Sequence, residues 1–203
     1  VELRRCDRDV PERRSCHEEI FMVSEFEELS NIDVHTELEE ALGRKILIKH
    51  DAKLSAYAEW HCAEEIKGID RGSLAIVRSR GYGIGCGFVV NGNIVNGHLG
   101  LAGEAGYMGI NFNRHKKGEE GRGTLEYSAG VESVVRYMKE RLYEFPESPL
   151  NENSNYMDVF EAYKHGDELA DWAVSKVAWM LGYGIANIIY IINPDCIIIG
   201  PDY

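Results

Sequence analysis

Two adjacent residues, His50 and Asp51, form the first place in this 203-residue chain where chemistry could occur. They follow a short apolar run and open a predicted helix. A carboxylate at the end of a strand lies where α/β sheets usually bind ligands. Asp51 could therefore accept a proton from a substrate hydroxyl as a general base. The alternative is that Asp51 only caps the helix, because Asp is a preferred N-cap residue. Position alone favours the cap.

Alternating glycines form the second candidate, in the stretch Gly81-Tyr82-Gly83-Ile84-Gly85-Cys86-Gly87. Such a stretch between strands lets backbone N–H groups approach a phosphate or another anion. It is neither a Walker loop nor a dinucleotide fingerprint, because no Lys-Ser/Thr follows it and it leads into a strand. The alternative is a tight hairpin that needs positive φ angles.

Two glutamates are the remaining candidates. Glu104 lies within a run of mostly small residues, Leu99 to Met108, and packing against such residues does not explain an acid at this position. Glu126 lies in Thr124-Leu125-Glu126-Tyr127-Ser128. A carboxylate can accept two hydroxyl hydrogen bonds at once, and such charged bonds are strong, so these residues suit sugar recognition. The alternative for both is a solvated surface acid.

The elements that must position these residues can be predicted from periodicity. We expect a helix over residues 34–42 that ends at Gly43, a strand over 45–49 and a helix over 52–66. Strands at 74–78 and 86–90 form one hairpin. Asn91-Gly92 predicts a second hairpin, with Ile94 and Val95 on its returning strand. Two helices over about 131–142 and 168–189 and a strand at 196–199 complete a mixed α/β domain with an antiparallel portion.

Composition narrows the class of protein. The chain is 44% hydrophobic, with a net charge of −12, so we expect a packed core and no surface for nucleic acid within these residues. Five dispersed cysteines, with no C-x-x-C pair, indicate neither a disulfide framework nor a four-thiolate zinc site. The charge-free run 177–194 is better explained by a buried helix and a turn than by a membrane span. We expect no secretory signal.

Five blocks together resemble the ROK family, which comprises bacterial sugar kinases and sugar-responsive transcriptional repressors. The resemblance runs from about Glu28 to the end, with the order and spacing of the blocks preserved. The blocks are Ile48-Lys49-His50-Asp51-Ala52, the glycine stretch from Gly81 to Gly87, Gly103-Glu104-Ala105-Gly106-Tyr107-Met108, Leu125-Glu126, and Ala186-Asn187-Ile188-Ile189 with residues 193–200.

This resemblance implies an actin-like (ribonuclease H-like) fold with a sugar in its cleft. Asp51 would match the catalytic base, and Glu104 and Glu126 the sugar-binding acids. The candidate substrate-binding set is completed by His50 and Tyr107. Gly81, Gly83 and Gly85 would match a phosphate loop that faces ATP.

The sequence departs from the family pattern at positions that contact phosphate or bind metal in the family. His50 replaces the usual Asn, Tyr82 replaces a Thr in the phosphate loop, and the Asp-x-Gly-Gly-Thr loop of the N-terminal lobe is absent from the sequence. The four zinc ligands of the family would fall on Tyr107, Lys117, Glu119 and Thr124. These are not a usual zinc set, so we predict no structural zinc.

The expected organisation has three parts: a charged N-terminal segment (1–31), a remnant of the N-terminal lobe (32–70) and a ROK-like C-terminal lobe (71–203). We expect the sequence to be a piece of something larger, because it opens with Val1 and stops after an apolar strand-like run. The predicted function is a cytoplasmic, dimeric, sugar-binding effector domain of a ROK-type regulator, which contacts DNA through a segment outside this chain. The alternative is an ATP- and Mg²⁺-dependent kinase of a hexose or N-acetylhexosamine.

Overall fold

The computed structural model describes residues 32–62, 72–81, 83–98, 100–111 and 123–200. They divide into two compact units. The first contains the described residues up to Asp51 together with 96–102. The second contains those from Ala52 to Val95 and from Gly103 onward.

Helix α1 (Val34–Leu42) is the regular element of the first unit's described part. Asp33 caps its N-terminus by accepting from the Thr36 N–H, and Gly43 ends it in the left-handed conformation. The predicted strand over 45–49 was wrong. The Ile46 N–H donates to Glu39 Oε1 at 3.0 Å, and the Ile46 carbonyl is 3.0 Å from His35 Nε2. Side chains of α1 therefore contact the N–H and carbonyl groups of Ile46, which would pair with a neighbouring strand if this segment belonged to a sheet.

A four-stranded sheet forms the centre of the second unit, with the order β3-β2-β1-β4. Both predicted hairpins are confirmed. Strand β1 (Leu74–Arg80) pairs antiparallel with β2 (Gly83–Val90), which pairs antiparallel with β3 (Asn93–Ile94). Asn91 and Gly92 both have positive φ in the turn, as a two-residue hairpin requires. Strand β4 (Cys196–Ile199) lies parallel to β1.

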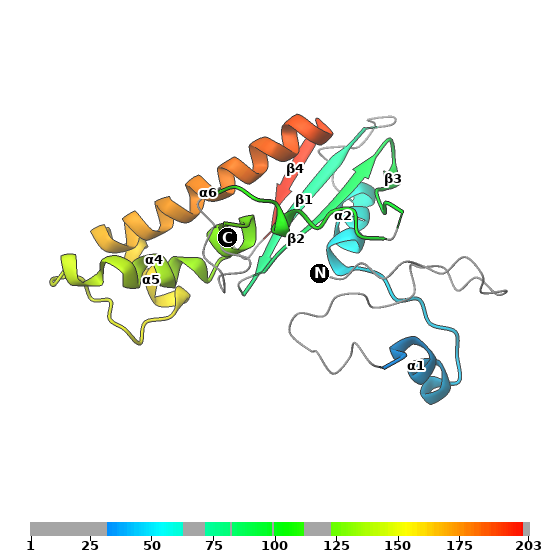
Figure 1. Ribbon diagram of the computed structural model, residues 1–203, viewed down its shortest axis with the longest axis horizontal. Coiled ribbons are helices and arrows are strands. Elements are labelled where there is room, and N and C mark those ends of the chain that lie inside the picture. The colour runs from blue at the N-terminus through cyan, green and yellow to red at the C-terminus, as the bar shows by residue number, and fades with distance from the viewer. Residues whose placement is uncertain (1–31, 63–71, 82, 99, 112–122, 201–203) are drawn as a thin grey trace. The chain divides into compact units, whose positions relative to one another are not determined.

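Helices cover both faces of this sheet. On one face, α3 (Leu125–Ala129) and the C-terminal half of α6 (Glu168–Ile192) pack on alternate residues of β1 and β2, including Val77 and Cys86. On the other face, α2 (Asp51–Cys62) packs through Ala56 on Leu74 and Ile76. Figure 1 shows α6 running along the sheet. Burial on both faces explains why β1 is apolar at successive positions.

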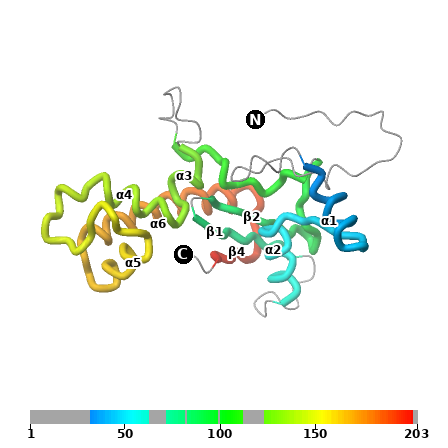
Figure 2. The backbone as a smooth tube through the Cα atoms, turned by 90° about the horizontal axis from the view of Figure 1, so that it is seen from below, coloured from blue at the N-terminus to red at the C-terminus, as the bar shows by residue number. Residues whose placement is uncertain are grey.

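A second core joins three helices at the N-terminal end of α6. Helices α4 (Ser133–Arg141) and α5 (Tyr156–Lys164) contribute Met138 and Val159, and α6 contributes Leu169 and Ala173. The tube in Figure 2 shows these helices gathered beside the N-terminal half of α6. Helix α5 was not predicted, although its sequence carries a capping box in which Asn155 and Asp158 satisfy each other's backbone N–H groups.

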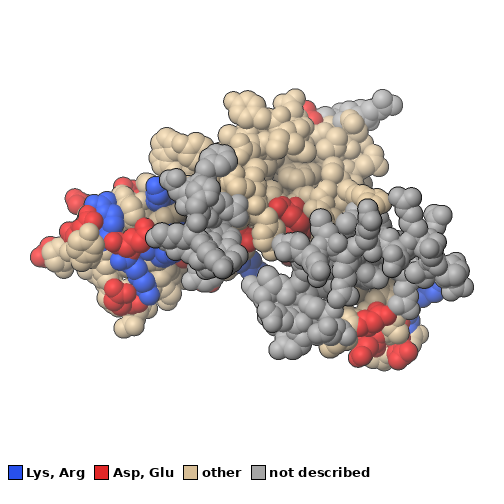
Figure 3. Space-filling view, viewed as in Figure 1, with Lys and Arg blue, Asp and Glu red and all other residues tan. Residues whose placement is uncertain are grey.

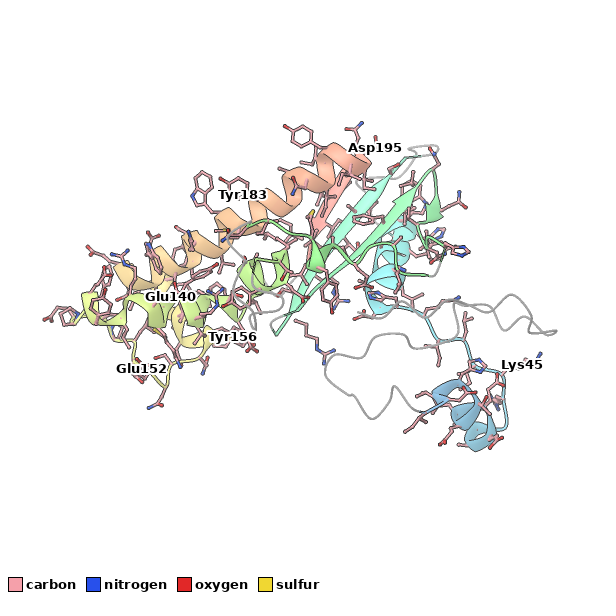
Figure 4. All side chains as sticks on the ribbon, in the orientation of Figure 1. Lys45, Glu140, Glu152, Tyr156, Tyr183 and Asp195 are labelled. Atoms are coloured by element: carbon pink, nitrogen blue, oxygen red, sulfur yellow. The ribbon has the colours of Figure 1, made fainter. Side chains whose placement is uncertain are left out.

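The apolar composition of the C-terminal half of α6 predicted burial on all sides, but one side of this half is exposed. Leu181, Gly184 and Ile188 face the core, whereas Trp179 is 67% and Tyr190 is 86% exposed. The exposed side forms an uncharged surface in Figure 3, and Tyr183 projects outward from the helix in Figure 4. Helix α6 is long and apolar enough to cross a membrane by length and composition alone, a test that core helices also pass.

Candidate functional site

The candidate site is built on the outer edge of β2. Strand β3 pairs only with Val89 and Val90, at the end of β2. Alongside the earlier residues of β2 lies the turn that carries Glu104 and the short 3₁₀ helix η3 (Ala105–Tyr107). Helix α3, with Glu126 in its first turn, also contacts β2 and η3.

Two glycines allow this turn to lie directly on backbone carbonyls of β2. A Cβ atom at Gly103 would be 2.9 Å from the Cys86 carbonyl oxygen, and one at Gly106 would strike the Ile84 carbonyl oxygen. Gly103 also has a φ of +97°, a backbone angle that residues other than glycine rarely adopt. The small residues around Glu104 are therefore explained by close backbone approach to β2.

Glu104 and Glu126 come together at this edge. The position of a Cβ atom at Gly106 lies 3.0 Å from Glu126 Oε2, so the second carboxylate reaches the turn that carries the first. Burial raises the pKa of the Glu126 carboxyl; a hydrogen bond with the Ile84 backbone opposes that effect, and the negative charge of Glu104 adds to it. The structure therefore joins two of the three acids that the sequence singled out.

Thr124 positions Glu126 by capping α3, since its side chain accepts from the Tyr127 N–H. Tyr107, the third candidate on this side, closes η3 and is 42% exposed. Of the positions that match the family's zinc ligands, Lys117 and Glu119 lie outside the described residues. Within the described ranges, no group of three or more His, Cys, Asp and Glu side chains could hold a metal ion.

His50 and Asp51 belong to the first unit. Asp51 is the first residue of α2, and its Oδ1 lies 3.6 Å from His50 Nδ1. The side chain of Asp51 is 79% exposed. Its convergence with Glu104 and Glu126 stays a prediction, because those glutamates belong to the second unit.

The glycine stretch that the sequence predicted as a phosphate loop serves several structural purposes. Gly81 has a φ of +59° at the turn between β1 and β2, and Tyr82 lies outside the described residues. Gly83 begins β2. Gly85 and Gly87 face α2: a Cβ atom would lie 3.3 Å from Ala52 Cβ at Gly85 and 2.8 Å from Ala56 Cβ at Gly87. These two glycines therefore allow α2 to pack closely on the sheet.

Three residues near these sites were missed by sequence reasoning. Lys53 on α2 is 5% exposed, and a Cβ atom at Gly103 would lie 3.7 Å from its Cε. Cys86 is fully buried, and burial together with the Glu104 charge raises the pKa of its thiol to about 12. Glu132 Oε1 lies 3.6 Å from the Cβ position at Gly81. One signal was available for Lys53, which lies among the small residues Ala52 and Ala56 that the helix buries.

The mixed α/β sheet with helices on both faces has the actin-like fold that the family resemblance implied. The ROK family model matches residues 16–202, so the chain belongs to the ROK family. A ROK family glucokinase from Streptomyces griseus, solved with glucose and AMPPNP, has the same fold, with a TM-score of 0.71 and 23% identity over 83% of this chain and 55% of that one.

Curated relatives fall into two functional classes. A glucokinase from Halalkalibacterium halodurans is 32% identical over 172 residues, which cover 80% of this chain and 50% of the relative. A xylose repressor from Caldicellulosiruptor bescii is 26% identical over 175 residues, which cover 84% of this chain and 43% of the repressor. The chain thus spans about half the length of the curated relatives it matches. Kinases and repressors both fit this family membership.

Proposed function

We propose that the chain is the sugar-binding effector domain of a ROK-type transcriptional regulator, with DNA contact made by a segment outside these 203 residues. The observation that carries the sugar-binding part is the pairing of Glu104 and Glu126 at the edge of β2. Two carboxylates on a rigid, glycine-packed turn can each accept hydroxyl hydrogen bonds in fixed directions. Relatives named for glucose, xylose and N-acetylglucosamine supply the sugars to test.

A regulator is favoured over a kinase by the surroundings of the glycine hairpin. The Glu132 carboxylate lies beside Gly81, and the Glu132 N–H donates to the Gly81 carbonyl at 3.3 Å. A fixed negative charge at this turn repels the phosphates that the loop would have to cradle. Phosphoryl transfer depends mainly on positioned positive charge around those phosphates. Glu132 therefore opposes binding of ATP at this position.

The alternative is an ATP- and Mg²⁺-dependent sugar kinase. The exposed carboxylate of Asp51 supports it, since a binding domain does not need a base. Several relatives are named glucokinase or N-acetyl-D-glucosamine kinase. In this alternative, ATP and Mg²⁺ would supply the phosphoryl group and its charge neutralisation, while Asp51 would take the proton from the attacking hydroxyl.

Calorimetric titration with glucose, xylose and N-acetylglucosamine, with and without ATP and Mg²⁺, distinguishes the two functions. We expect one of these sugars to bind without nucleotide, and ATP to give no heat of binding. Sugar phosphorylation that is lost in Asp51→Asn would instead establish the kinase. If neither sugar nor ATP binds, both proposed functions are wrong. The proposed regulator is also expected to be cytoplasmic, dimeric and free of structural zinc.

A further inference from the structure

Lys53 is a lysine buried at the sheet side of α2, where a charged side chain requires a partner. It is 5% exposed, and lysines are almost never buried to this extent unless they are paired. Burial lowers the pKa of its ammonium group, whereas the Glu104 charge acts in the opposite direction. Lys53 therefore interacts with the acid of the candidate site, although it was not among the residues that the sequence indicated.

The backbone of the turn fixes where the Lys53 side chain ends. The Cβ position at Gly103 is 3.7 Å from Lys53 Cε and 2.9 Å from the Cys86 carbonyl oxygen. The lysine stem thus lies against the residue that precedes Glu104, and a side chain at Gly103 would push the turn off β2. This packing places the ammonium group next to the Glu104 turn.

Three described groups have pKa values that the Glu104 charge shifts, and of these three Lys53 is the cation. Glu126 on α3 is a second acid, and its carboxyl feels the Glu104 charge as a repulsion. The Cys86 thiol on β2 has a pKa of about 12 and is neutral at physiological pH. Tyr107 lies on the same turn. Two acids that share a site suppress each other's ionisation unless a cation offsets them.

We propose that Lys53 is a positioning residue of the sugar site, which pairs with Glu104 and holds that carboxylate in the orientation that accepts hydroxyl hydrogen bonds. This inference rests on the proposed sugar-binding function. It also narrows the ligand class: because the Lys53 charge is used by Glu104, the site takes a neutral sugar. Sugar phosphates and uronic acids of the same configuration meet two carboxylates and bind more weakly than the parent sugar.

The test compares Lys53→Met, Lys53→Arg and the matched control Lys139→Met, which removes a charge from an exposed position on α4. Sugar affinity is measured by calorimetry from pH 5 to pH 8. Lys53→Met should weaken binding by about 10- to 100-fold at neutral pH, the worth of one charge-assisted hydrogen bond. Its loss of binding on acidification should begin at a higher pH than in the wild type. Lys53→Arg should restore part of the affinity, and Lys139→Met should match the wild type.

A measurement without ligand separates this inference from the proposed function. NMR titration of the Lys53 ammonium group should show its midpoint at a lower pH in Glu104→Gln than in the wild type, because the Glu104 charge that raises the pKa of Lys53 is gone. Thermal unfolding of each variant identifies loss of fold. An unchanged Lys53 midpoint in a folded Glu104→Gln protein overturns the inference even if the wild type binds sugar. A shifted midpoint, together with a wild type that binds none of the sugars, supports the Lys53–Glu104 pair and refutes the sugar site.

Discussion

Glu126 Oε2 lies 3.0 Å from the position that a Cβ atom would occupy at Gly106, so the second acid of the site reaches directly over the backbone that follows the first. Gly106 is buried in η3, and the same Cβ atom would strike the Ile84 carbonyl oxygen on β2. The distance between the two glutamates therefore depends on the absence of a side chain at this position. A sugar site built from Glu104 and Glu126 should be sensitive to a single methyl group here.

Gly106→Ala should displace either the turn or Glu126 and reduce sugar affinity by about 10-fold or more, since the loss of one charged hydrogen bond costs about 1.5–3 kcal/mol. Calorimetry with the best-binding sugar measures this effect. Gly182→Ala is the control, because a Cβ atom at Gly182 meets nothing within 4 Å. An alanine there should leave affinity unchanged and stabilise α6 by about 0.5–1 kcal/mol. Equal sugar affinity in both variants would contradict the arrangement of the site.

Gly87→Ala tests the interpretation of the glycine stretch as a packing surface for α2. The added methyl group would lie 2.8 Å from Ala56 Cβ and would also strike the Ala52 carbonyl oxygen. Overpacking of this kind typically costs about 1–3 kcal/mol. We expect a lower midpoint in urea unfolding, with Gly182→Ala again as the control. Unchanged stability would show that α2 does not approach β2 so closely.

Glu126→Gln should make the protein more stable at neutral pH while it weakens sugar binding. Burial raises the pKa of Glu126 in the folded chain, so its carboxyl is held protonated to a higher pH than in the unfolded chain. The folded state is then favoured below the ordinary pKa and loses stability as pH rises through the raised value. Glutamine removes this loss.

Thermal unfolding as a function of pH measures the effect of Glu126→Gln. The melting temperature of the variant should exceed that of the wild type at pH 7, and the difference should shrink toward pH 4. Glu152→Gln, at an exposed residue, should behave as the wild type at every pH. A Glu126→Gln protein that is less stable than the wild type at pH 7 would show that the carboxylate is favourably bound in the folded state.

Cys86 should resist alkylation in the folded protein. Burial and the Glu104 charge raise the pKa of its thiol to about 12, so the reactive thiolate is scarce near neutral pH. Cys62 is exposed at the end of α2 and provides the internal comparison. Peptide mass spectrometry after brief iodoacetamide treatment at pH 8 should find Cys62 modified and Cys86 protected. Rapid modification of Cys86 would mean that β2 is open to solvent on this face.

Much of the fold could be predicted from local patterns. Asn91-Gly92 predicted its hairpin because few residues tolerate the positive φ angles found there. Gly43 likewise marked the end of α1. The strand expected at 45–49 failed because its backbone bonds to side chains of α1, a contact that hydrophobicity does not encode. The exposed half of α6 shows similarly that an apolar composition does not decide which face a neighbour covers.

The candidate site was predictable only in part. Glu104 was singled out because an acid among small residues has no packing role, and both Glu104 and Glu126 because carboxylates suit the recognition of sugar hydroxyls. Lys53 was missed because its pairing with Glu104 depends on α2 crossing β2, which brings together residues that are far apart in sequence. The roles of Gly85 and Gly87 were missed for the same reason, since alternating glycines suit both an anion loop and a closely packed helix.

The most direct test of the sugar site is the affinity of three proteins for the sugar that binds best: the wild type, Glu104→Gln and Glu152→Gln. Both variants exchange one acid for its neutral isostere, but only Glu104 belongs to the pair at the edge of β2. Calorimetry should show affinity reduced by about 10-fold or more in Glu104→Gln and unchanged in Glu152→Gln. Equal affinity in all three proteins would contradict the assignment of Glu104 to a sugar site.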